Sequence, residues 1–469
     1  MRFWDAIALI LVLSAVGLTY EIAAGRVLAP FFGTSLVTWT TVIATVLAGF
    51  SLGSALGGLI AERPRDAAAQ SVRLALVVTS VLMALSPTVL AVIYTIGARG
   101  TGGMVVSVVV AFFPASVLVS LPSPFLAKLA VEARPGREGS TLGLVLAAGS
   151  IGAIVGAILA GFVALPMIGS VLTFVGCGAA TLMCVPWVRG GTAPPFLMLL
   201  PGLLAIAFGL TNRSICRYES GMSCIDIVQT DGALRLLSDR TTQAGERIKT
   251  EGVADPADVL VLPYTEVIWA QMDAVLSDDA SVLFIGGGGY TLPSLLVTER
   301  PLAKAVAVEI DPLVTRVVLE NLPWAGDVVR NNSRLDIVHA DGRMYLNEIN
   351  QHFDAAVMDV FSSGSVPAHL VTFETYKRVQ DIVDGPVYIN LIDRPDGPLA
   401  RGTHAILTQL YAHVAAVIGP VSSRGFANVI LTASPDPIAP QIGLPDGYSI
   451  TTISDARAFT DDLGWVGHR

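Results

Sequence analysis

A run of glycines and three acidic residues stand where short apolar segments of the chain end. Gly286 to Gly289 follow residues 282–285, and Glu309, Asp341 and Asp359 stand at the ends of three later segments. Such segments predict buried parallel strands, and the carboxyl ends of parallel strands meet at one edge of an open sheet. We therefore expect the glycines and the acids to line one ligand site.

Several of these positions predict contacts to a nucleoside. Glu309 lies 23 residues after Gly286, a spacing at which an acid accepts the hydroxyl protons of a ribose. Asp341 with Gly342 suits an adenine amine beside its ring, and a solvated turn is the alternative interpretation. Backbone N–H groups can approach a ligand closely at the first three glycines, Gly286, Gly287 and Gly288.

Asp359 is the candidate general base. A carboxylate that ends a buried strand can be tuned for proton removal, whereas an N-cap or turn aspartate is the alternative. His339 and His369 lie near the same edge, but a solitary histidine is more often structural. The sequence has no Walker-type lysine after the glycines and no G-x-S-x-G elbow, which argues against nucleotide hydrolysis and a serine hydrolase. Four cysteines and six histidines are too scattered for a zinc site.

Residues 1–211 have the composition of a transmembrane domain. The chain is 53% apolar and 14% charged, and most of the apolar excess precedes residue 211. We therefore expect about seven helices in contact with lipid, in a multi-pass protein of the cell (inner) membrane. The first stretch is too long for a cleaved signal peptide. The stretches close to the roughly 20 residues that cross a bilayer are 4–28, 38–60, 74–96, 104–121, 141–162, 172–188 and 195–210.

Small and charged residues in this half allow more than one interpretation. Rows of glycines favour close helix packing, with a transport path as the second interpretation. Glu21 is either a functional acid in the membrane or the partner of Arg26 at a helix end. The two rows are Gly49, Gly53 and Gly57, and Gly149, Gly152 and Gly156.

The charges between the stretches predict an orientation. The positive-inside rule places the cation-rich connections and the N-terminus in the cytoplasm, so that seven spans would leave the C-terminal half outside. Cys216 and Cys224 would then suit an extracytoplasmic disulfide, and Cys177 and Cys184 would fill space between helices. A cytosolic nucleotide substrate argues for the opposite side, so both remain open. The cations after the second, fourth and sixth stretches are Arg63, Arg65, Lys128, Arg134, Arg137 and Arg189, against Arg99 after the third and fifth.

The remaining chain has the pattern of soluble α/β structure. In residues 212–250 an Asp-Gly step separates two strand-like runs and predicts a small β-hairpin domain. In residues 251–469 strands alternate with helices, which predicts a Rossmann-like doubly wound sheet of the AdoMet-methyltransferase type. The net charge of −9, without a long basic run, argues against nucleic acid as a partner. The expected helices are 263–276, 292–298, 312–321, 374–383 and 403–418, and further strands are 387–391 and 427–432.

At this point the residues resemble a known family. Over about residues 217–430 the sequence is similar to the polyamine aminopropyltransferases, the spermidine synthases. The membrane half and the phrases 359–370 and 460–462 resemble the branch fused to a multi-pass, transporter-like region. The motifs that carry the resemblance are Tyr264-Thr265-Glu266, Gly286 to Gly289, the sequence Val-Glu-Ile-Asp-Pro at 308–312, Asp341-Gly342, and Asp359 with Pro367.

The resemblance implies an enzyme, a transferase, and assigns roles to individual residues. It implies transfer of an aminopropyl group from decarboxylated S-adenosylmethionine, a co-substrate and not a tightly bound cofactor, to putrescine or another amine. Asp359 would be the base, Glu309 the ribose ligand, and Asp341 with Gly342 the adenine side. The other implied contacts are Gln243 and Pro367 to the nucleoside, and Tyr264, Glu266 and Ser362 to the amine.

The sequence also departs from the family where the amine binds. Gly289 and Ser362 replace two aspartates, and Thr265 replaces a histidine beside the tyrosine. A buried dication without these acids loses charge pairing. Two alternatives follow: an AdoMet-dependent methyltransferase, and a non-catalytic nucleotide- or polyamine-sensing domain of a membrane transporter. Soluble relatives are dimers or tetramers, so the resemblance also implies a homo-oligomer.

Overall fold

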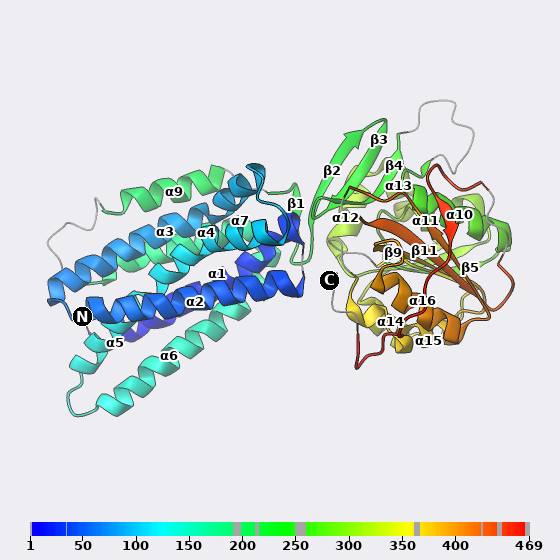
Figure 1. The fold of residues 1–469 in the computed structure, drawn as a ribbon. Helices are drawn as coiled ribbons and strands as arrows, with labels where there is room; N and C mark the ends of the chain where they lie inside the picture. Colours follow the sequence, from blue (N-terminus) through cyan, green and yellow to red (C-terminus); the bar gives the residue numbers. More distant parts are fainter. Residues whose placement is uncertain are drawn as a thin grey trace. The chain divides into compact units, whose positions relative to one another are not determined.

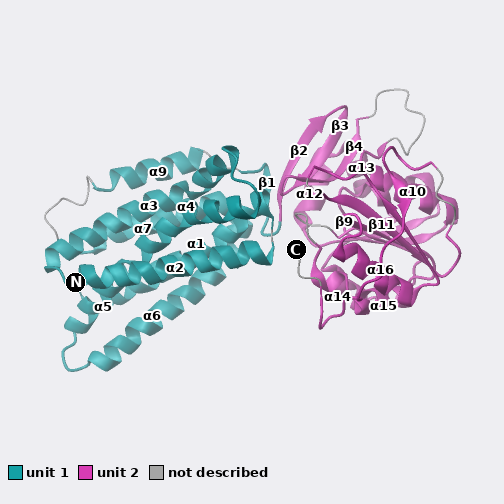
Figure 2. Cartoon of the chain, viewed as in Figure 1, with its two compact units in different colours: residues 1–222 teal, residues 223–469 magenta. Residues whose placement is uncertain are grey.

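The computed structural model of the chain folds into two compact units. The structure describes residues 2–33, 35–190, 198–211, 215–248, 259–360, 366–423, 425–438 and 443–464. The first unit is Met1–Met222 and is helical, and the second is Ser223–Arg469 and contains the sheets (Figure 2).

Long apolar helices form the first unit (Figure 1). They coincide with the predicted apolar stretches, although residues 195–197 of the last stretch lie outside the described residues. Five helical runs among the described residues are long and apolar enough to cross a membrane: Phe3–Phe32, Leu36–Ala61, Arg65–Thr95, Gly100–Glu132 and Glu138–Trp187. The helices are α1 (Phe3–Phe32), α2 (Leu36–Ala61), α3 (Arg65–Thr95), α4 (Gly100–Ser120), α5 (Pro122–Glu132), α6 (Glu138–Ile158), α7 (Leu165–Cys184) and α9 (Leu200–Thr211).

The run from α6 to α7 makes two passes along α1. A Cβ at Gly156 would overlap the carbonyl of Ala15, whereas Cys177 contacts the carbonyl of Val16. The chain therefore reverses direction between them. It does so at Gly169, whose φ of 78° and ψ of 176° interrupt the helix. A run of 50 residues would otherwise be about 75 Å long, more than twice a bilayer core.

Contacts within this unit show which connections share an end. At the end where α1 begins, Arg134 lies 3.6 Å from the centre of the Phe3 ring, and Lys128 donates to the carbonyl of Ala61 at the end of α2. At the opposite end, Ser170 N donates to Glu219, and Arg26 Nε donates to Ser220 O at 3.4 Å. The chain therefore leaves the bundle at the end opposite its N-terminus.

The glycine rows pack helices together. A Cβ at Gly53 would overlap the carbonyl of Val117 in α4, and one at Gly57 would overlap that of Leu121. Gly152 and Gly156 approach Leu11 and Ala15 of α1 in the same way, while Gly149 has only an ordinary contact, 3.7 Å to Ser14 Oγ. A Cβ at Gly49 would lie 2.6 Å from that of Ser116, so the packing interpretation holds for Gly49 as well as for Gly53, Gly57, Gly152 and Gly156.

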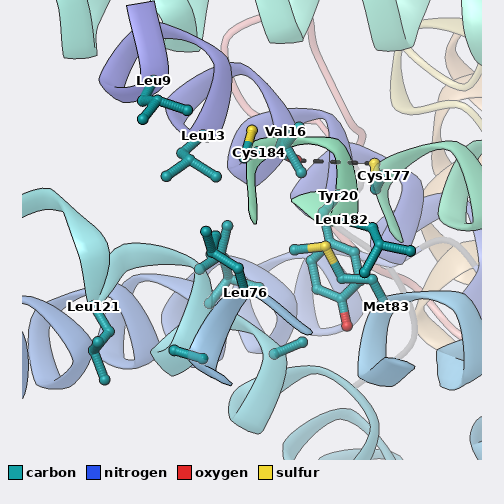
Figure 3. Close-up of a cluster of buried hydrophobic side chains, with 14 of the residues drawn as sticks. Leu9, Leu13, Val16, Tyr20, Leu76, Met83, Leu121, Cys177, Leu182 and Cys184 are labelled. Atoms are coloured by element: carbon teal, nitrogen blue, oxygen red, sulfur yellow. Dashed lines mark hydrogen bonds between the residues drawn. The ribbon is translucent and has the colours of Figure 1, made fainter. Parts of the chain in front are cut away.

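Buried side chains of α1 form the centre of the helical core. Leu9, Leu13, Val16 and Tyr20 meet side chains of α3 and α7 (Figure 3). Tyr20 OH bonds Ser86 Oγ at 2.7 Å and packs edge-on against Phe112 and Phe174. Cys177 and Cys184 are buried free thiols, as expected of fillers, whereas Cys216 and Cys224 are disulfide-bonded.

The second unit begins with a small antiparallel β-structure. Strands β2 (Cys224–Thr230), β3 (Ala233–Ser238) and β4 (Thr241–Arg247) pair in sequence. Asp231 and Gly232 both have positive φ in the tight turn between β2 and β3, which confirms the predicted hairpin. The two-residue strand β1 (Tyr218–Glu219) precedes them.

An eight-stranded mixed sheet forms the rest of the unit. Its order is β12-β10-β11-β9-β8-β5-β6-β7, with β5 to β9 parallel and β10 to β12 antiparallel. The strand order reverses between β5 and β8, where α/β sheets of this kind bind ligands. The strands are β5 (Ser281–Ile285), β6 (Lys304–Glu309), β7 (Leu335–His339), β8 (Ala355–Met358), β9 (Val387–Asp393), β10 (His413–Ile418), β11 (Ala427–Ser434) and β12 (Ser449–Thr451).

Helices cover both faces of this sheet (Figure 1). One predicted helix is wrong at its end: 403–418 was expected, but α16 ends at Leu410 and residues 413–418 form β10. The pairing of β10 with both β11 and β12 outweighs the helical pattern. The helices are α10 (Pro263–Val275), α11 (Thr291–Glu299), α12 (Pro312–Asn321), α13 (Pro323–Asn331), α14 (Gly342–Glu348), α15 (Phe373–Ile382) and α16 (Pro398–Leu410).

Candidate active site

The glycine run forms a tight turn between β5 and α11. Gly286 has a φ of +97° and Gly288 a φ of +53°, which disfavour other residues. A Cβ at Gly286 would overlap the carbonyl oxygen of Asp359, and one at Gly287 would lie 2.6 Å from the Tyr290 ring. The turn therefore needs glycine both for its conformation and for its proximity to Asp359.

Asp359 follows directly after β8, beside this turn. Its N–H donates to Ile285 O at 2.9 Å. Its Oδ2 accepts the hydroxyl of Tyr264 at 2.8 Å, and its Oδ1 accepts Nδ2 of Asn390 at 2.9 Å. Burial raises the pKa of Asp359 above that of an ordinary aspartate, while the bonds from Asn390 and Tyr264 lower it. Each carboxylate oxygen of Asp359 accepts one side-chain hydrogen bond, whereas the N–H groups that an N-cap or turn aspartate would bond belong to residues 361–362, outside the described residues.

Glu309 ends β6 and is held by backbone N–H groups. Oε2 accepts Gly287 N at 3.0 Å and Oε1 accepts Asp311 N at 2.9 Å. Burial raises the pKa of Glu309, and the N–H groups of Asp311 and Gly287 oppose that rise. Each oxygen retains a further lone pair, so the carboxylate can accept two hydroxyls of a ribose.

Asp341 has a structural role that the sequence left open. Its Oδ1 accepts the N–H groups of Arg343 and Met344, so it caps α14. Its Oδ2 lies 3.0 Å from Nε2 of His369. Burial alone would raise the pKa of Asp341, but Met344, His369 and Arg343 lower it overall. An adenine amine at Asp341 would therefore share Oδ2 with His369.

Several of the predicted residues line one small pocket. The pocket beside the glycine turn is lined by Gln243, Tyr264, Gly286, Gly287, Gly288 and Asp359 among others. Nε2 of Gln243 is buried and has no partner among the residues that the structure describes. Gly342 closes the neighbouring strand end, where a Cβ would lie 2.6 Å from Ile285. Pro367 precedes the 3-10 turn that carries His369.

One predicted amine contact, Glu266, does not line this pocket. Glu266 lines a separate cavity of about 400 Å³ along α10, toward Gln271 and Tyr388. Residues two apart on a helix face different sides, so Tyr264 and Glu266 diverge. Ser362 lies outside the described residues.

The structure adds residues that the sequence did not indicate. Asn390 bonds Asp359 and in turn accepts Nδ2 of Asn428 at 2.9 Å. Beneath the glycine turn, Tyr290 OH bonds Thr315, which bonds His339. Only the left-handed φ of Tyr290 and the pairing of distant strands bring these groups together.

The described residues contain no group of three or more metal-ligating side chains. They form a doubly wound α/β domain with a glycine turn and two carboxylates, those of Glu309 and Asp359, at the strand ends. Residues 262–390 of this domain match the spermine/spermidine synthase domain.

Related proteins support that family for the C-terminal unit. The polyamine aminopropyltransferase of Vibrio vulnificus is 30% identical over 148 residues, which are 30% of this chain and 47% of that protein. Polyamine aminopropyltransferase 1 of Streptomyces coelicolor is 23% identical over 406 residues, 80% of this chain and 73% of that protein. The chain spans about half the length of the first curated relatives, 47%, 52% and 47%.

Two solved structures are also similar at low identity. A probable spermidine synthase from Corynebacterium glutamicum has a TM-score of 0.41 at 20% identity, covering 48% of this chain and 82% of its own. A spermidine synthase in complex with the transition-state analogue AdoDATO has a TM-score of 0.39 at 20% identity, covering 49% and 76%.

Proposed function

We propose that the chain is a membrane-bound aminopropyltransferase that transfers an aminopropyl group from decarboxylated S-adenosylmethionine to putrescine or another amine. The observation that carries this proposal is Asp359: a half-buried carboxylate, held by two donors, in one pocket with the glycine turn and Gln243. The match of residues 262–390 to the spermine/spermidine synthase domain supports the same reaction.

The nucleoside of the donor fits the residues around the turn. Glu309 has lone pairs for the ribose hydroxyls. The buried Nε2 of Gln243 has no hydrogen-bond acceptor among the described residues and could donate to the nucleoside. The pocket offers N–H groups and small residues at Gly286 to Gly288, where a nucleoside can approach the backbone. Pro367 and Gly342 would then flank the adenine ring of the donor.

Asp359 would activate the acceptor. An ammonium beside the carboxylate transfers a proton to it, and the freed nitrogen lone pair attacks the aminopropyl carbon next to the sulfonium. The carbon–sulfur bond breaks, its electron pair returns to sulfur, and methylthioadenosine leaves as a neutral thioether. The raised pKa of Asp359 suits a group that must accept this proton. Tyr264 holds one oxygen and aligns the carboxylate for the transfer.

The acceptor side is less charged than a diamine would favour. Asp359 is the only carboxylate among the described residues that line the pocket. At Gly289, where the family resemblance implies an aspartate, a Cβ would overlap that of Ala244. A side chain there would require β4 to move. The pocket therefore suits an acceptor with one ammonium, which Asp359 can pair, better than a dication that needs a carboxylate for each of its charges.

The experiment that tests this function uses the full-length protein purified in detergent. It is incubated with decarboxylated S-adenosylmethionine and a panel of mono- and diamines, and the products are identified by mass spectrometry. We expect methylthioadenosine and an aminopropylated amine in equal amounts. Methyl transfer from S-adenosylmethionine would instead establish a methyltransferase, and stabilisation by nucleosides without any product would establish a sensing domain.

We further propose a location in the cell membrane with the second unit on the extracytoplasmic side. The apolar surfaces of α2, α4 and α6 suit lipid. The end of the bundle near Phe3 carries Arg63, Arg65, Lys128, Arg134, Arg137 and Arg189, and the positive-inside rule assigns that end to the cytoplasm. The chain leaves at the opposite end, where the disulfide-bonded Cys216 and Cys224 follow.

Reporter fusions after Arg469 test this location. Alkaline phosphatase, which folds only outside the cytoplasm, should be active, and a green fluorescent protein fusion should be dark. The reverse pattern would place the domain in the cytosol and contradict the proposed orientation. On the extracytoplasmic side the enzyme would draw its donor from outside the cytosol, so supply of the donor becomes part of the function.

A further inference from the structure

Two asparagines on neighbouring strands lie next to the candidate base. In the parallel pairing of β8 and β9, Met358 lies opposite Ile389, so the next residues, Asp359 and Asn390, are neighbours. In the antiparallel pairing of β9 and β11, Asn428 lies opposite Ile392. Asn428 and Asn390 are therefore diagonal neighbours on one face of the sheet.

The side chains form a directed chain of hydrogen bonds. Asn428 Nδ2 donates to Asn390 Oδ1 at 2.9 Å, and Asn390 Nδ2 donates to Asp359 Oδ1 at 2.9 Å. Asn390 is 2% exposed. A buried amide whose oxygen is already bonded presents only its N–H to the carboxylate, and donors in series strengthen one another.

We propose that Asn390 and Asn428 form a positioning pair for the base: Asn390 fixes the Asp359 carboxylate and Asn428 fixes the orientation of Asn390. The inference rests on the proposed function only in naming Asp359 the base. Without Asn428, the Asn390 amide can rotate and turn its oxygen toward the carboxylate, which repels it. The bond from Asn390 favours the ionised form of Asp359 and orients its carboxylate, while Tyr264 holds the other oxygen.

The charged and titratable groups around Asp359 set the expected direction of the pH effect. Tyr264 of α10 contacts it directly, and Tyr448 and then Glu266 lie beyond Tyr264. Burial and the charge of Asp359 raise the pKa of Tyr264 well above its ordinary value, so Tyr264 remains a donor. Burial raises the pKa of Asp359 and the Asn390 bond lowers it. Loss of that bond should therefore move the protonation of Asp359 to higher pH.

The test compares Asn390→Leu and Asn428→Leu with wild type. The carboxyl of Asp359 is titrated by infrared difference spectroscopy, with Asp359→Asn identifying its band, and kcat/KM is measured against pH. In Asn390→Leu we expect the carboxyl titration and the acidic limb of kcat/KM to shift upward by about one pH unit, so that kcat/KM on that limb falls about tenfold at a given pH. Asn428→Leu should shift both in the same direction by less.

Two further variants separate positioning from general damage. Asn428→Gln keeps an amide donor, so its carboxyl titration should lie closer to that of wild type than the titration of Asn428→Leu does. Thr432→Val removes a hydrogen bond of β11 to Gln271, away from the site, and should leave the titration unchanged. An unchanged carboxyl titration in both leucine variants overturns the proposal. A shifted titration in a protein that transfers no aminopropyl group supports the pair and overturns the proposed function. Should Asn390→Leu fail to fold, the half-buried Asn428 still decides the question.

Discussion

Both units contain closely spaced glycines, but the glycines do different work. In the helical unit, Gly53 and Gly57 of α2 have helical backbones and lie against the carbonyls of Val117 and Leu121. In the second unit, Gly286 has a φ of +97° and lies against the backbone of Asp359. The first kind provides room for a neighbouring helix, and the second provides both room and a turn that other residues resist.

Substitutions at the two kinds of glycine should therefore change different properties: the free energy of unfolding in the helical unit, and turnover in the second unit. A substitution in the helical row should act on packing and leave each folded molecule's turnover intact. A substitution in the turn should displace Asp359 and change turnover first. Two acids offer the same contrast, since the buried Glu21 lies in α1 and the half-buried Asp359 lies in the pocket.

The largest effect is expected from removing the base. Asp359→Asn keeps the shape of the side chain but cannot accept the proton of the amine, so turnover should fall by roughly 10² to 10⁴. Binding of methylthioadenosine, followed by thermal shift, should change little. Glu21→Gln is the matched change in the helical unit and should retain turnover. Equal loss in both variants would mean that the helical unit takes part in the reaction.

A change in the glycine turn should come next. Gly286→Ala places a methyl group against the carbonyl of Asp359 and forces an unfavourable φ. A displacement of about 1 Å at a catalytic group costs on the order of 10² in rate, so kcat should fall by about that factor. Gly232→Asn in the turn between β2 and β3 is the control, because asparagine tolerates a φ of +72° and a Cβ there meets no atom of the described residues within 4 Å. Similar kcat values for the two variants would contradict the role assigned to Gly286.

Much of the second unit was predictable because local signals mark it. Strand ends followed by glycine or acid located the site edge at Gly286 and Asp359, and Asp231-Gly232 located the hairpin. Residues 413–418 were wrongly predicted as part of a helix, because a short apolar run after a helix suits either a helix or a strand. Their partner strand, β11, lies beyond a long turn, so only tertiary pairing decides.

The details of the site were not predictable for the same reason. Asn390 and Asn428 are single polar residues within apolar strands, and nothing local says that they meet. Their contact depends on the register of β9 with β11. Glu266 follows Tyr264 in a motif, yet the helical twist directs it to another cavity. Sequence order therefore located the elements, and strand register and helix phase decided which side chains share the pocket.

A glycine of the helical row should show a smaller and different effect. Gly53→Ala would push a methyl group into the Val117 carbonyl, and overpacking of this kind costs about 1–3 kcal/mol of stability. Chemical unfolding in detergent micelles measures the loss. The amount of folded protein should fall, but turnover per folded molecule should equal that of wild type. A fall in turnover at constant stability would show that α2 and α4 influence the site.

The smallest effect is expected one residue from the row. Gly58 is next to Gly57 in α2, but a Cβ there meets no atom of the described residues within 4 Å. Gly58→Ala removes only the conformational freedom of glycine, so it should raise stability by roughly 0.5–1 kcal/mol, whereas Gly57→Ala should lower it. The same unfolding measurement applies to both variants. Equal destabilisation by the two variants would mean that contact with α4 is not what makes Gly57 necessary. The helical glycines would then no longer differ from those of the turn in the way described.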